Sequence, residues 1–244
     1  MSKLNSSFGY TKVKPKEKTK LVQNVFSEVA KNYDLMNDLM SFGSHRLWKK
    51  KFVEIINPKK DEVIIDVGSG TGDIAKNILK TKFNGELHLL DLNPQMLNIS
   101  KLTIEKNINV YFHQGNAEDL KFKKNTFDKY TIAFCLRNIT NIEKSIEEAS
   151  RVLKPGGVYF CLEFGEPNSI LTSQLYKQYR TRALPWIGKL ITRNKEAYKY
   201  LSESIDLFPN QEKLKYILEK IGFNDVSYIN LFDGIVTIHK GYKI

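Results

Sequence analysis

The alternation of strand-like and helix-like segments between residues 63 and 163 constrains the fold of this chain more than any other feature. Short apolar runs, several of them rich in β-branched residues, predict strands at 63–67, 86–91, 109–113, 127–134 and 157–163. The intervening segments predict helices near 72–80, 94–106 and 142–153. Such repetition of strand and helix is typical of a parallel sheet with helices on both faces.

The segment before the first predicted strand has a different character. Lysines at 3, 12, 14, 16, 18 and 20, with few apolar residues between them, predict a frayed basic tail over residues 1–20. Apolar residues then recur at steps of three and four from 21 to 33, which predicts an amphipathic helix. A second helix is expected after Gly43.

The C-terminal third also departs from the alternation. Almost sixty residues follow Phe164 before the next predicted strands, at 224–231 and 234–240. The turn Phe232-Asp233-Gly234 between them suits a hairpin and therefore an antiparallel strand at the end of the sheet. After the tail, we expect one domain with N-terminal helices (21–60), a cofactor-binding core (61–164), a helical insertion that forms a lid over the substrate (165–222) and a C-terminal hairpin (223–244).

The composition limits the classes of protein to which the chain can belong. Its 244 residues are 41% hydrophobic and 27% charged, as in an ordinary globular protein. No run approaches the roughly 18 apolar residues of a membrane span, and the N-terminus lacks the apolar block of a secretory signal, so a cytoplasmic protein is expected. The formal charge of +11 suits nucleic acid, an anionic membrane surface or a phosphorylated ligand. Cys135 and Cys161 lie in apolar segments and are interpreted as buried side chains, and no metal site is expected.

A glycine-rich turn joins the first predicted strand to the first helix of the core. The segment Asp66-Val67-Gly68-Ser69-Gly70-Thr71-Gly72-Asp73 lets the backbone turn tightly and approach a ligand where the helix begins. The spacing GxGxG after an acidic residue differs from the GxGxxG that usually holds a dinucleotide pyrophosphate. Acidic side chains such as Asp66 and Asp73 favour a cationic ligand, and S-adenosylmethionine carries positive charge on its sulfonium and its amine.

Two further polar segments follow strands at the same predicted edge of the sheet. Asp91 ends the second strand, where a carboxylate can accept both hydroxyls of an adenosine ribose. The alternative is that Asp91 or Asn93 caps the helix that begins at Pro94, and the two roles can coexist. The loop after the third strand contains Asn116 and Ala117, where an amide and backbone groups can meet the adenine edge. Taken alone, that loop would be an ordinary polar turn.

Several motifs together make a family resemblance specific. The chain resembles the ubiquinone/menaquinone biosynthesis C-methyltransferase family from about Val25 to the C-terminus. The matching stretches are VFSEVAKNYDLMNDLMSFGSHRLWK at 25–49, DVGSGTGD at 66–73, DLNPQML at 91–97, GNAEDL at 115–120, FCLRNI at 134–139, RVLKPGG at 151–157 and GYKI at 241–244. Methyltransferases in general share only the glycine turn, the acidic residue after the second strand and a segment like LKPGG, so the N-terminal block and LRN narrow the assignment.

The resemblance implies a class I, Rossmann-like methyltransferase with an α/β fold, in which a seven-stranded mixed sheet has its last strand antiparallel and helices on both faces. It also implies cofactor contacts at Thr71, Asp91, Asn116 and Ala117. Ala133 stands where the family often has serine, so a hydroxyl contact near the cofactor is expected to be missing or replaced by a backbone contact. The predicted binding residues for S-adenosylmethionine, which leaves as S-adenosylhomocysteine, are Asp66, Gly68, Gly70, Thr71, Asp91, Asn116 and Ala117.

The reaction implied by the resemblance is methylation of a ring carbon in a polyprenyl benzoquinol or naphthoquinol. Attack by carbon needs an electron-rich ring, and loss of a proton from a quinol hydroxyl, with a pKa near the phenolic value of about 10, supplies it. Arg137 and Asn138 follow the fourth strand and are the predicted catalytic residues, with Arg137 favouring the phenolate and the proton leaving through a water or a side chain such as His113 or Glu163. An ion pair at the surface is the alternative role for Arg137. Lone histidines are interpreted as structural, namely His45, His88 and His239.

Residues 176–199 mix aromatic and aliphatic side chains with seven Lys or Arg and the single acid Glu196. This mixture suits a lid over an apolar substrate that also rests on anionic lipid, whereas a solvated helical face is the alternative. An isoprenoid tail resists transfer to water by about 0.8 kcal/mol per methylene, so peripheral membrane association is expected of the enzyme. A homodimer or a complex with other enzymes of quinone biosynthesis stays open.

Two other functions compete with this interpretation. An RNA methyltransferase would use the positive charge and the interleaved tyrosines and arginines, but FCLRN stands where base-amine methylases have an NPPY-type segment, and no nucleic-acid module is present in the pattern. No nucleic-acid partner is therefore expected. A noncatalytic scaffold subunit of a quinone-biosynthesis complex is the second alternative, and the intact glycine turn, Asp91 and Arg137 argue against it.

Overall fold

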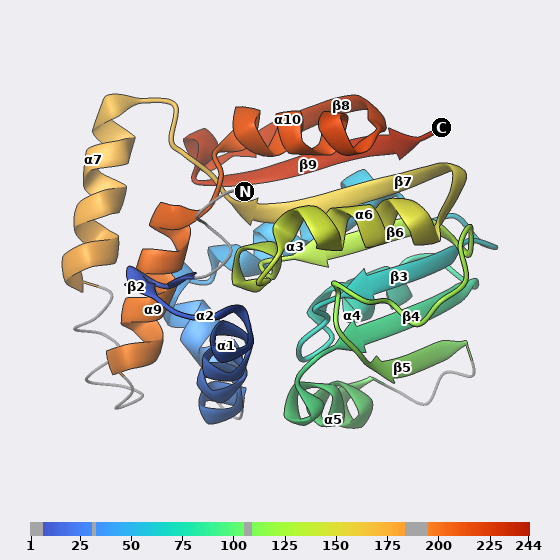
Figure 1. Cartoon of the computed structure of the whole chain (residues 1–244), viewed down its shortest axis with the longest axis horizontal. Coiled ribbons are helices and arrows are strands. Elements are labelled where there is room, and N and C mark those ends of the chain that lie inside the picture. The colour runs from blue at the N-terminus through green and yellow to red at the C-terminus, as the bar shows by residue number, and fades with distance from the viewer. Residues whose placement is uncertain (1–6, 31–32, 105–108, 184–194) are drawn as a thin grey trace.

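The computed structural model describes residues 7–30, 33–104, 109–183 and 195–244. Within these residues, seven strands form one twisted sheet in the order β5-β4-β3-β6-β7-β9-β8 (Figure 1). The strands are β3 (Val63–Val67), β4 (Glu86–Asp91), β5 (Val110–Gln114), β6 (Phe127–Ala133), β7 (Leu153–Phe164), β8 (Phe223–Leu231) and β9 (Val236–Lys243). From β5 to β7 all pairings are parallel, whereas β9 is antiparallel to both β7 and β8. The predicted mixed sheet is confirmed, with the antiparallel last strand lying next to the edge rather than on it.

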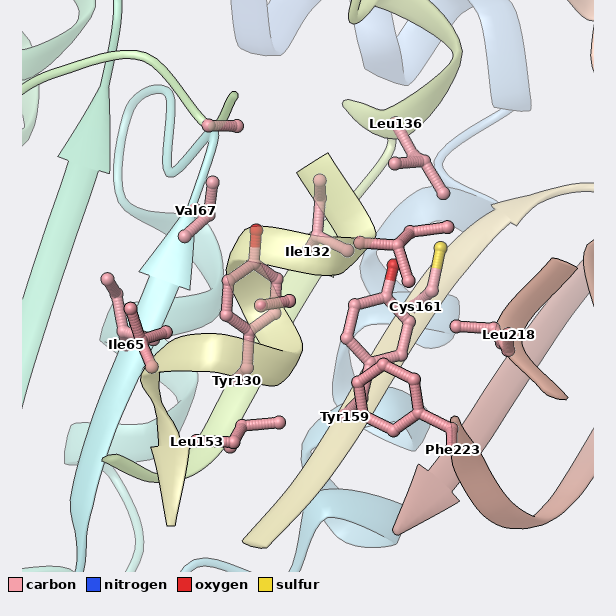
Figure 2. Packing of buried hydrophobic residues seen from close by; sticks show 14 of the residues in the cluster. Ile65, Val67, Tyr130, Ile132, Leu136, Leu153, Tyr159, Cys161, Leu218 and Phe223 are labelled. Atoms are coloured by element: carbon pink, nitrogen blue, oxygen red, sulfur yellow. The ribbon is translucent and has the colours of Figure 1, made fainter. Parts of the chain in front are cut away.

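Helices cover both faces because the buried strands are apolar on both sides. On β3, Ile64 packs in one cluster with helices α3 (Ser44–Ile56) and α4 (Asp73–Leu79). The next residue, Ile65, packs in a second cluster with α6 (Ile142–Val152) and α10 (Gln211–Ile221). Figure 2 shows this second cluster, in which Tyr130 and Tyr159 fill the space between the sheet and the helices. The alternation of Ile64 and Ile65 follows from the two-residue repeat of a strand.

The N-terminal segment corrects the expectation of a frayed tail. Residues 7–20 contain a two-stranded hairpin, β1 (Ser7–Phe8) with β2 (Thr11–Lys12), and the start of α1 (Pro15–Val29), while residues 1–6 lie outside the described part. Lys18 is buried, and its ammonium donates a hydrogen bond of 2.8 Å to the carbonyl of Ile139. The Tyr10 hydroxyl donates to Asp206, at 2.6 Å. The tail expectation was wrong for residues 7–20 because these side chains have specific partners far along the chain.

Most of the remaining helices lie at the end of the sheet where β3, β4 and β6 finish, whereas α5 (Pro94–Thr103) packs against β4 and β5 (Figure 1). The helices at that end are α1, α2 (Tyr33–Ser41), α7 (Ile170–Gln178), the π-helix η4 (Tyr179–Ala183) and α9 (Lys195–Leu207). The helix α2 was not predicted. Of the predicted lid, residues 184–194 lie outside the described residues. No helix in the described ranges is long and apolar enough to cross a membrane.

Candidate functional site

The glycine turn between β3 and α4 is held against the end of β4. The backbone N–H groups of Gly68 and Ser69 both donate to the carbonyl of Leu90, at 2.8 and 3.1 Å. Gly68 and Gly70 have φ of +66° and +54°, a conformation that glycine adopts without a steric penalty. A Cβ atom at Gly68 would overlap the Sγ of Cys135, whereas a Cβ at Gly70 would meet no atom within 4 Å. Gly68 therefore permits close packing of the protein, and Gly70 faces open space that a ligand can occupy.

The carboxylate of Asp91 braces the same turn. One oxygen accepts the backbone N–H of Gly70 and the other that of Asn93, both at 2.8 Å. The cap of α5 is Asn93, whose side-chain oxygen accepts the N–H groups of Gln95 and Met96. The predicted capping role thus belongs to Asn93, and Asp91 stays available for a ligand. Burial raises the pKa of Asp91, against which its backbone hydrogen bonds act.

Asp66 is the most deeply buried acid of the turn, at 1% exposure. One of its oxygens accepts the hydroxyl of Thr131 at 2.9 Å, and the other has no hydrogen-bond partner among the described residues. Burial raises the pKa of Asp66 to about 7. An unsatisfied buried carboxylate oxygen is costly, and a cationic ligand would relieve that cost. The amine of S-adenosylmethionine meets this requirement.

Two cavities meet at the glycine turn. We call the first the strand-end cavity, because residues after β3, β4 and β5 line it, among them Asp91, Asn116 and Ala117. We call the second the helical cavity, because α2, α3, α7 and α9 close it over Asp66, Thr71 and Arg137. The residues that line both are Phe26, Gly68, Gly70, Ala133, Phe134 and Asn138. The structure therefore brings all nine sequence-predicted site residues to one continuous region.

Arg137 is buried and not a surface residue, which corrects the alternative role considered for it. Its guanidinium pairs with Glu163, with 2.9 Å between Nη1 and Oε2, and stacks on the Phe164 ring at 5.1 Å from the ring centroid. The following residue, Asn138, accepts a hydrogen bond of 3.0 Å from the hydroxyl of Tyr200 on α9. Arg137 lines the helical cavity, and Asn138 lines both cavities.

Neither of the two side chains suggested as proton acceptors, Glu163 and His113, is available for that role, because each is engaged by other protein groups. Glu163 is committed to Arg137, both to its guanidinium and, at 3.3 Å, to its backbone N–H. The ring of His113 lies 3.0 Å from a nitrogen of His88 and packs edge-on against Phe122. His113 lines neither cavity. It belongs to an aromatic cluster on β4 and β5, which is a structural role.

The decisive comparison covers almost the whole chain. Residues 12–243 match the sequence profile of the ubiE/COQ5 methyltransferase family. The chain belongs to the ubiE/COQ5 methyltransferase family. Among its relatives, it is 48% identical to the ubiquinone/menaquinone biosynthesis C-methyltransferase UbiE of Rickettsia bellii over 98% of this chain and 99% of that protein. It is 46% identical to the enzyme of the same name from Zymomonas mobilis, over 98% of each chain.

The fold of this ubiE/COQ5 methyltransferase is also similar to solved structures. A methyltransferase of Thermotoga maritima, described as S-adenosylmethionine-dependent and as a possible histamine N-methyltransferase, superposes with a TM-score of 0.66 at 18% identity. The match covers 91% of this chain and 99% of that one. At such identity the likeness concerns the fold, and it confirms the predicted Rossmann-like class.

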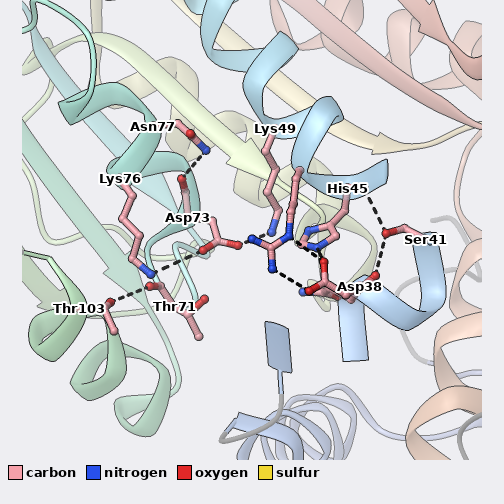
Figure 3. A network of polar contacts seen from close by, with 11 residues as sticks. Asp38, Ser41, His45, Lys49, Thr71, Asp73, Lys76, Asn77 and Thr103 are labelled. Atoms are coloured by element: carbon pink, nitrogen blue, oxygen red, sulfur yellow. Dashed lines mark hydrogen bonds and ion pairs between the residues drawn. The ribbon is translucent and has the colours of Figure 1, made fainter. Parts of the chain in front are cut away.

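The helical cavity of this ubiE/COQ5 methyltransferase contains residues that the sequence analysis had not assigned to the site. His45, Trp48 and Lys49 project from α3 into its wall, although His45 was interpreted as structural. Lys49 pairs with Asp73 at 2.6 Å, and His45 with Asp38 at 2.8 Å (Figure 3). The available signal was the N-terminal motif that contains SHRLWK, which identified the family without placing these side chains in the site.

Proposed function

We propose that this chain transfers the methyl group of S-adenosylmethionine to a ring carbon of a polyprenyl benzoquinol or naphthoquinol. The observation that supports it most directly is the meeting of two cavities at the glycine turn. One has the acidic and amide groups that suit a nucleoside, and the other is walled by aromatic side chains that suit an apolar ring, including Phe134, Phe164 and Tyr176. The relatives named as quinone-biosynthesis C-methyltransferases share nearly the full length of the chain.

The chain's own residues suit each part of the methyl donor. The two oxygens of Asp91 each hold one backbone N–H, and a carboxylate has further lone pairs that can accept the ribose hydroxyls. The free oxygen of Asp66 can hold the ammonium group, and the loop at Asn116 and Ala117 can meet the adenine. When bound, S-adenosylmethionine supplies an electrophilic methyl group on its sulfonium.

Arg137 would favour the ionised form of the quinol in the helical cavity. Its guanidinium is fixed by Glu163 and by Phe164, so it need not reorganise when charge develops on the substrate oxygen. The pairing with Glu163 also compensates the cost of burying a cation. Arginine stays protonated in proteins, so Arg137 stabilises the phenolate but does not remove the proton.

Contact with a membrane surface would give the enzyme access to a polyprenyl substrate. The helix α7 has no fully buried side chain, and Ile170, Leu171 and Leu175 are 78%, 67% and 59% exposed. Lys177 follows on the same helix, and the chain carries a formal charge of +11. An exposed apolar helix on a cationic protein suits peripheral association with anionic lipid.

A methyl-transfer assay tests the proposed function. The chain is incubated with methyl-labelled S-adenosylmethionine and with short-tailed demethylated benzoquinols and naphthoquinols, under reducing conditions that keep the rings as quinols. Label on a ring carbon, located by mass spectrometry and NMR, would support the proposal and would tell which ring is accepted. Label on oxygen, or no transfer to either ring despite tight binding of S-adenosylmethionine, would refute it.

A further inference from the structure

The tight junction between α2 and α3 brings the partly exposed acid Asp38 and the buried His45 together. Gly43, with φ of +75°, separates the two helices, and its N–H donates to the carbonyl of Asp38 at 2.8 Å. The N–H of His45 donates to the hydroxyl of Ser41 at 3.1 Å. As a result the carboxylate of Asp38 lies 2.8 Å from Nε2 of His45 (Figure 3).

This contact determines which ring nitrogen of His45 carries the hydrogen. A carboxylate is an acceptor, so Nε2 donates to Asp38 and Nδ1 of the neutral ring keeps its lone pair. Asp38 is itself held as an anion, because two hydrogen bonds from Arg46, of 2.8 and 2.6 Å, keep the pKa of Asp38 far below its usual range. Asp38 therefore orients the ring of His45, and Nδ1 of that ring can accept a proton.

Nδ1 of His45 is buried and has no hydrogen-bond partner within the described ranges. His45 is 5% exposed and lines the helical cavity together with Trp48, one helical turn further along α3. The indole N–H of Trp48 is likewise buried without a partner among the residues described. A bare acceptor and a bare donor on one wall of an aromatic cavity suit a ligand hydroxyl, which both gives and accepts a hydrogen bond.

We propose that His45, oriented by Asp38, is the group that accepts the proton of the substrate hydroxyl through Nδ1, an inference that rests on the proposed function. The O–H bond breaks and the proton moves to Nδ1. The electron pair on oxygen drives the ring carbon to bond with the methyl group, and the pair of the broken C–S bond stays on sulfur. The ring carbon then loses its hydrogen to water as a proton, which restores the aromatic ring. The imidazolium returns its proton to the phenolate oxygen formed in that step, which gives the methylated quinol and leaves His45 neutral for the next cycle.

Burial is the main reason that His45 is neutral and ready to accept a proton. Burial lowers the pKa of His45 below its usual value, and Lys49 on the same helix adds to this effect. Asp38 on α2 and Asp73 at the start of α4 oppose it. Because the neutral form is the base, the rate should rise with pH through the lowered pKa of His45 and then level off. Asp38 would stabilise the imidazolium once it forms, so it is a positioning residue.

Comparison of His45→Gln with His113→Gln tests the proposal. Glutamine can keep a donor toward Asp38 but lacks a basic nitrogen, and His113 is a matched control because it is a half-buried histidine outside both cavities. We expect kcat to fall by about 100-fold or more in His45→Gln, in line with the usual contribution of a general base. Affinity for S-adenosylhomocysteine should stay within about threefold, and His113→Gln should keep wild-type turnover. Asp38→Asn should move the acidic limb of the pH profile to lower pH, because Asp38 raises the pKa of His45.

Nitrogen NMR of histidine-labelled protein gives a measurement that does not depend on turnover. The signals absent from His45→Gln identify the ring, which should be neutral at pH 7 with its hydrogen on Nε2. A charged ring at pH 7, hydrogen on Nδ1, or a His45→Gln enzyme with near wild-type kcat would overturn the inference while quinol methylation by the wild type stands. If the wild type methylates no quinol, the proposed function itself fails and this inference fails with it.

Discussion

The carboxylates of Asp66 and Asp91, at the ends of neighbouring strands, differ in how far their charge is compensated. Asp91 holds two backbone N–H groups, so much of its charge is compensated before a ligand arrives. Asp66 holds a single hydroxyl and keeps one bare oxygen. The sequence could predict that both acids lie at the edge of the sheet, because each ends a strand. It could not predict how each is satisfied, since Thr131, the partner of Asp66, and Gly70, a partner of Asp91, come from other parts of the chain.

Binding of the methyl donor should depend on pH through Asp66. Burial raises the pKa of Asp66 to about 7, so below that pH a cationic ligand must displace a proton. Affinity is therefore expected to rise with pH up to about 7, by at most roughly tenfold per unit, and then level off. Calorimetry at pH 6 in two buffers of different ionisation enthalpy should detect proton release. Asp66→Asn should bind more weakly at pH 8 and lose the dependence, and a pH-independent wild type would show that Asp66 does not meet the ligand.

The two glycines of the turn should respond differently to alanine. At Gly68 a Cβ would overlap Cys135, so Gly68→Ala is expected to lower the free energy of unfolding by about 2 kcal/mol or more. At Gly70 the backbone strain of about 1 kcal/mol remains but no protein atom is struck, so the loss should fall mainly on affinity for S-adenosylmethionine. Urea unfolding and calorimetry on both variants separate the effects. Equal losses of stability would mean that Gly70 also packs against protein.

Substitution of Arg137 separates its charge from its shape. Arg137→Ala leaves Glu163 buried without its partner, which should cost about 3–5 kcal/mol of folding stability. Arg137→Lys keeps the charge and should retain most of that stability, yet lose turnover, because an ammonium lacks the planar guanidinium that stacks on Phe164. Urea unfolding and kcat are measured for both. If Arg137→Lys turned over at the wild-type rate, any buried cation would suffice at this position.

Among the elements, the strands were more predictable than the helices. The apolar runs located β3 and β4 at their observed bounds because a strand buried on both faces is apolar throughout. β7 begins at Leu153, four residues before its prediction, because Leu153 pairs with Phe127 ahead of a register shift. The helix α2 was missed since its sequence YDLMNDLMS has nearly as many polar as apolar residues. That omission hid Asp38, and with it the partner of His45.

Lys18, which attaches α1 to the carbonyl of Ile139, should make the free energy of unfolding depend on pH in the alkaline range. Burial lowers the pKa of Lys18 to about 8, whereas in the unfolded chain it lies near 10.5. Between these values the unfolded state binds more protons, so stability should rise with pH by up to about 3 kcal/mol from this group. Lys18→Met removes the effect. The free energies of unfolding of wild type and variant are measured in urea at several pH values. Between pH 8 and 10.5 the value for wild type should rise relative to that of the variant. A constant difference would place the Lys18 ammonium in water.

At the scale of the whole molecule, both cavities lie at one end of the sheet. Residues at the carboxyl ends of the strands line both cavities, and the helices α1, α2, α7 and α9 lie beyond this end of the sheet (Figure 1). Residues of α2, α7 and α9 line the helical cavity, so the exposed apolar side chains of α7 belong to a helix that closes the cavity proposed for the quinol.

Vesicle flotation tests this orientation with a matched pair of leucines. Leu171 on α7 and Leu102 on α5 are 67% and 86% exposed, and α5 packs against β4 and β5, far from α7 (Figure 1). Binding is expected to vesicles that contain phosphatidylglycerol, to be absent with phosphatidylcholine alone, and to weaken as salt screens the attraction. Leu171→Ser should weaken binding because it removes apolar surface from the lipid contact, whereas Leu102→Ser carries the same change of residue and should not. Equal binding by the two variants would mean that α7 does not touch the membrane, and a polyprenyl quinol would then have to enter by another face.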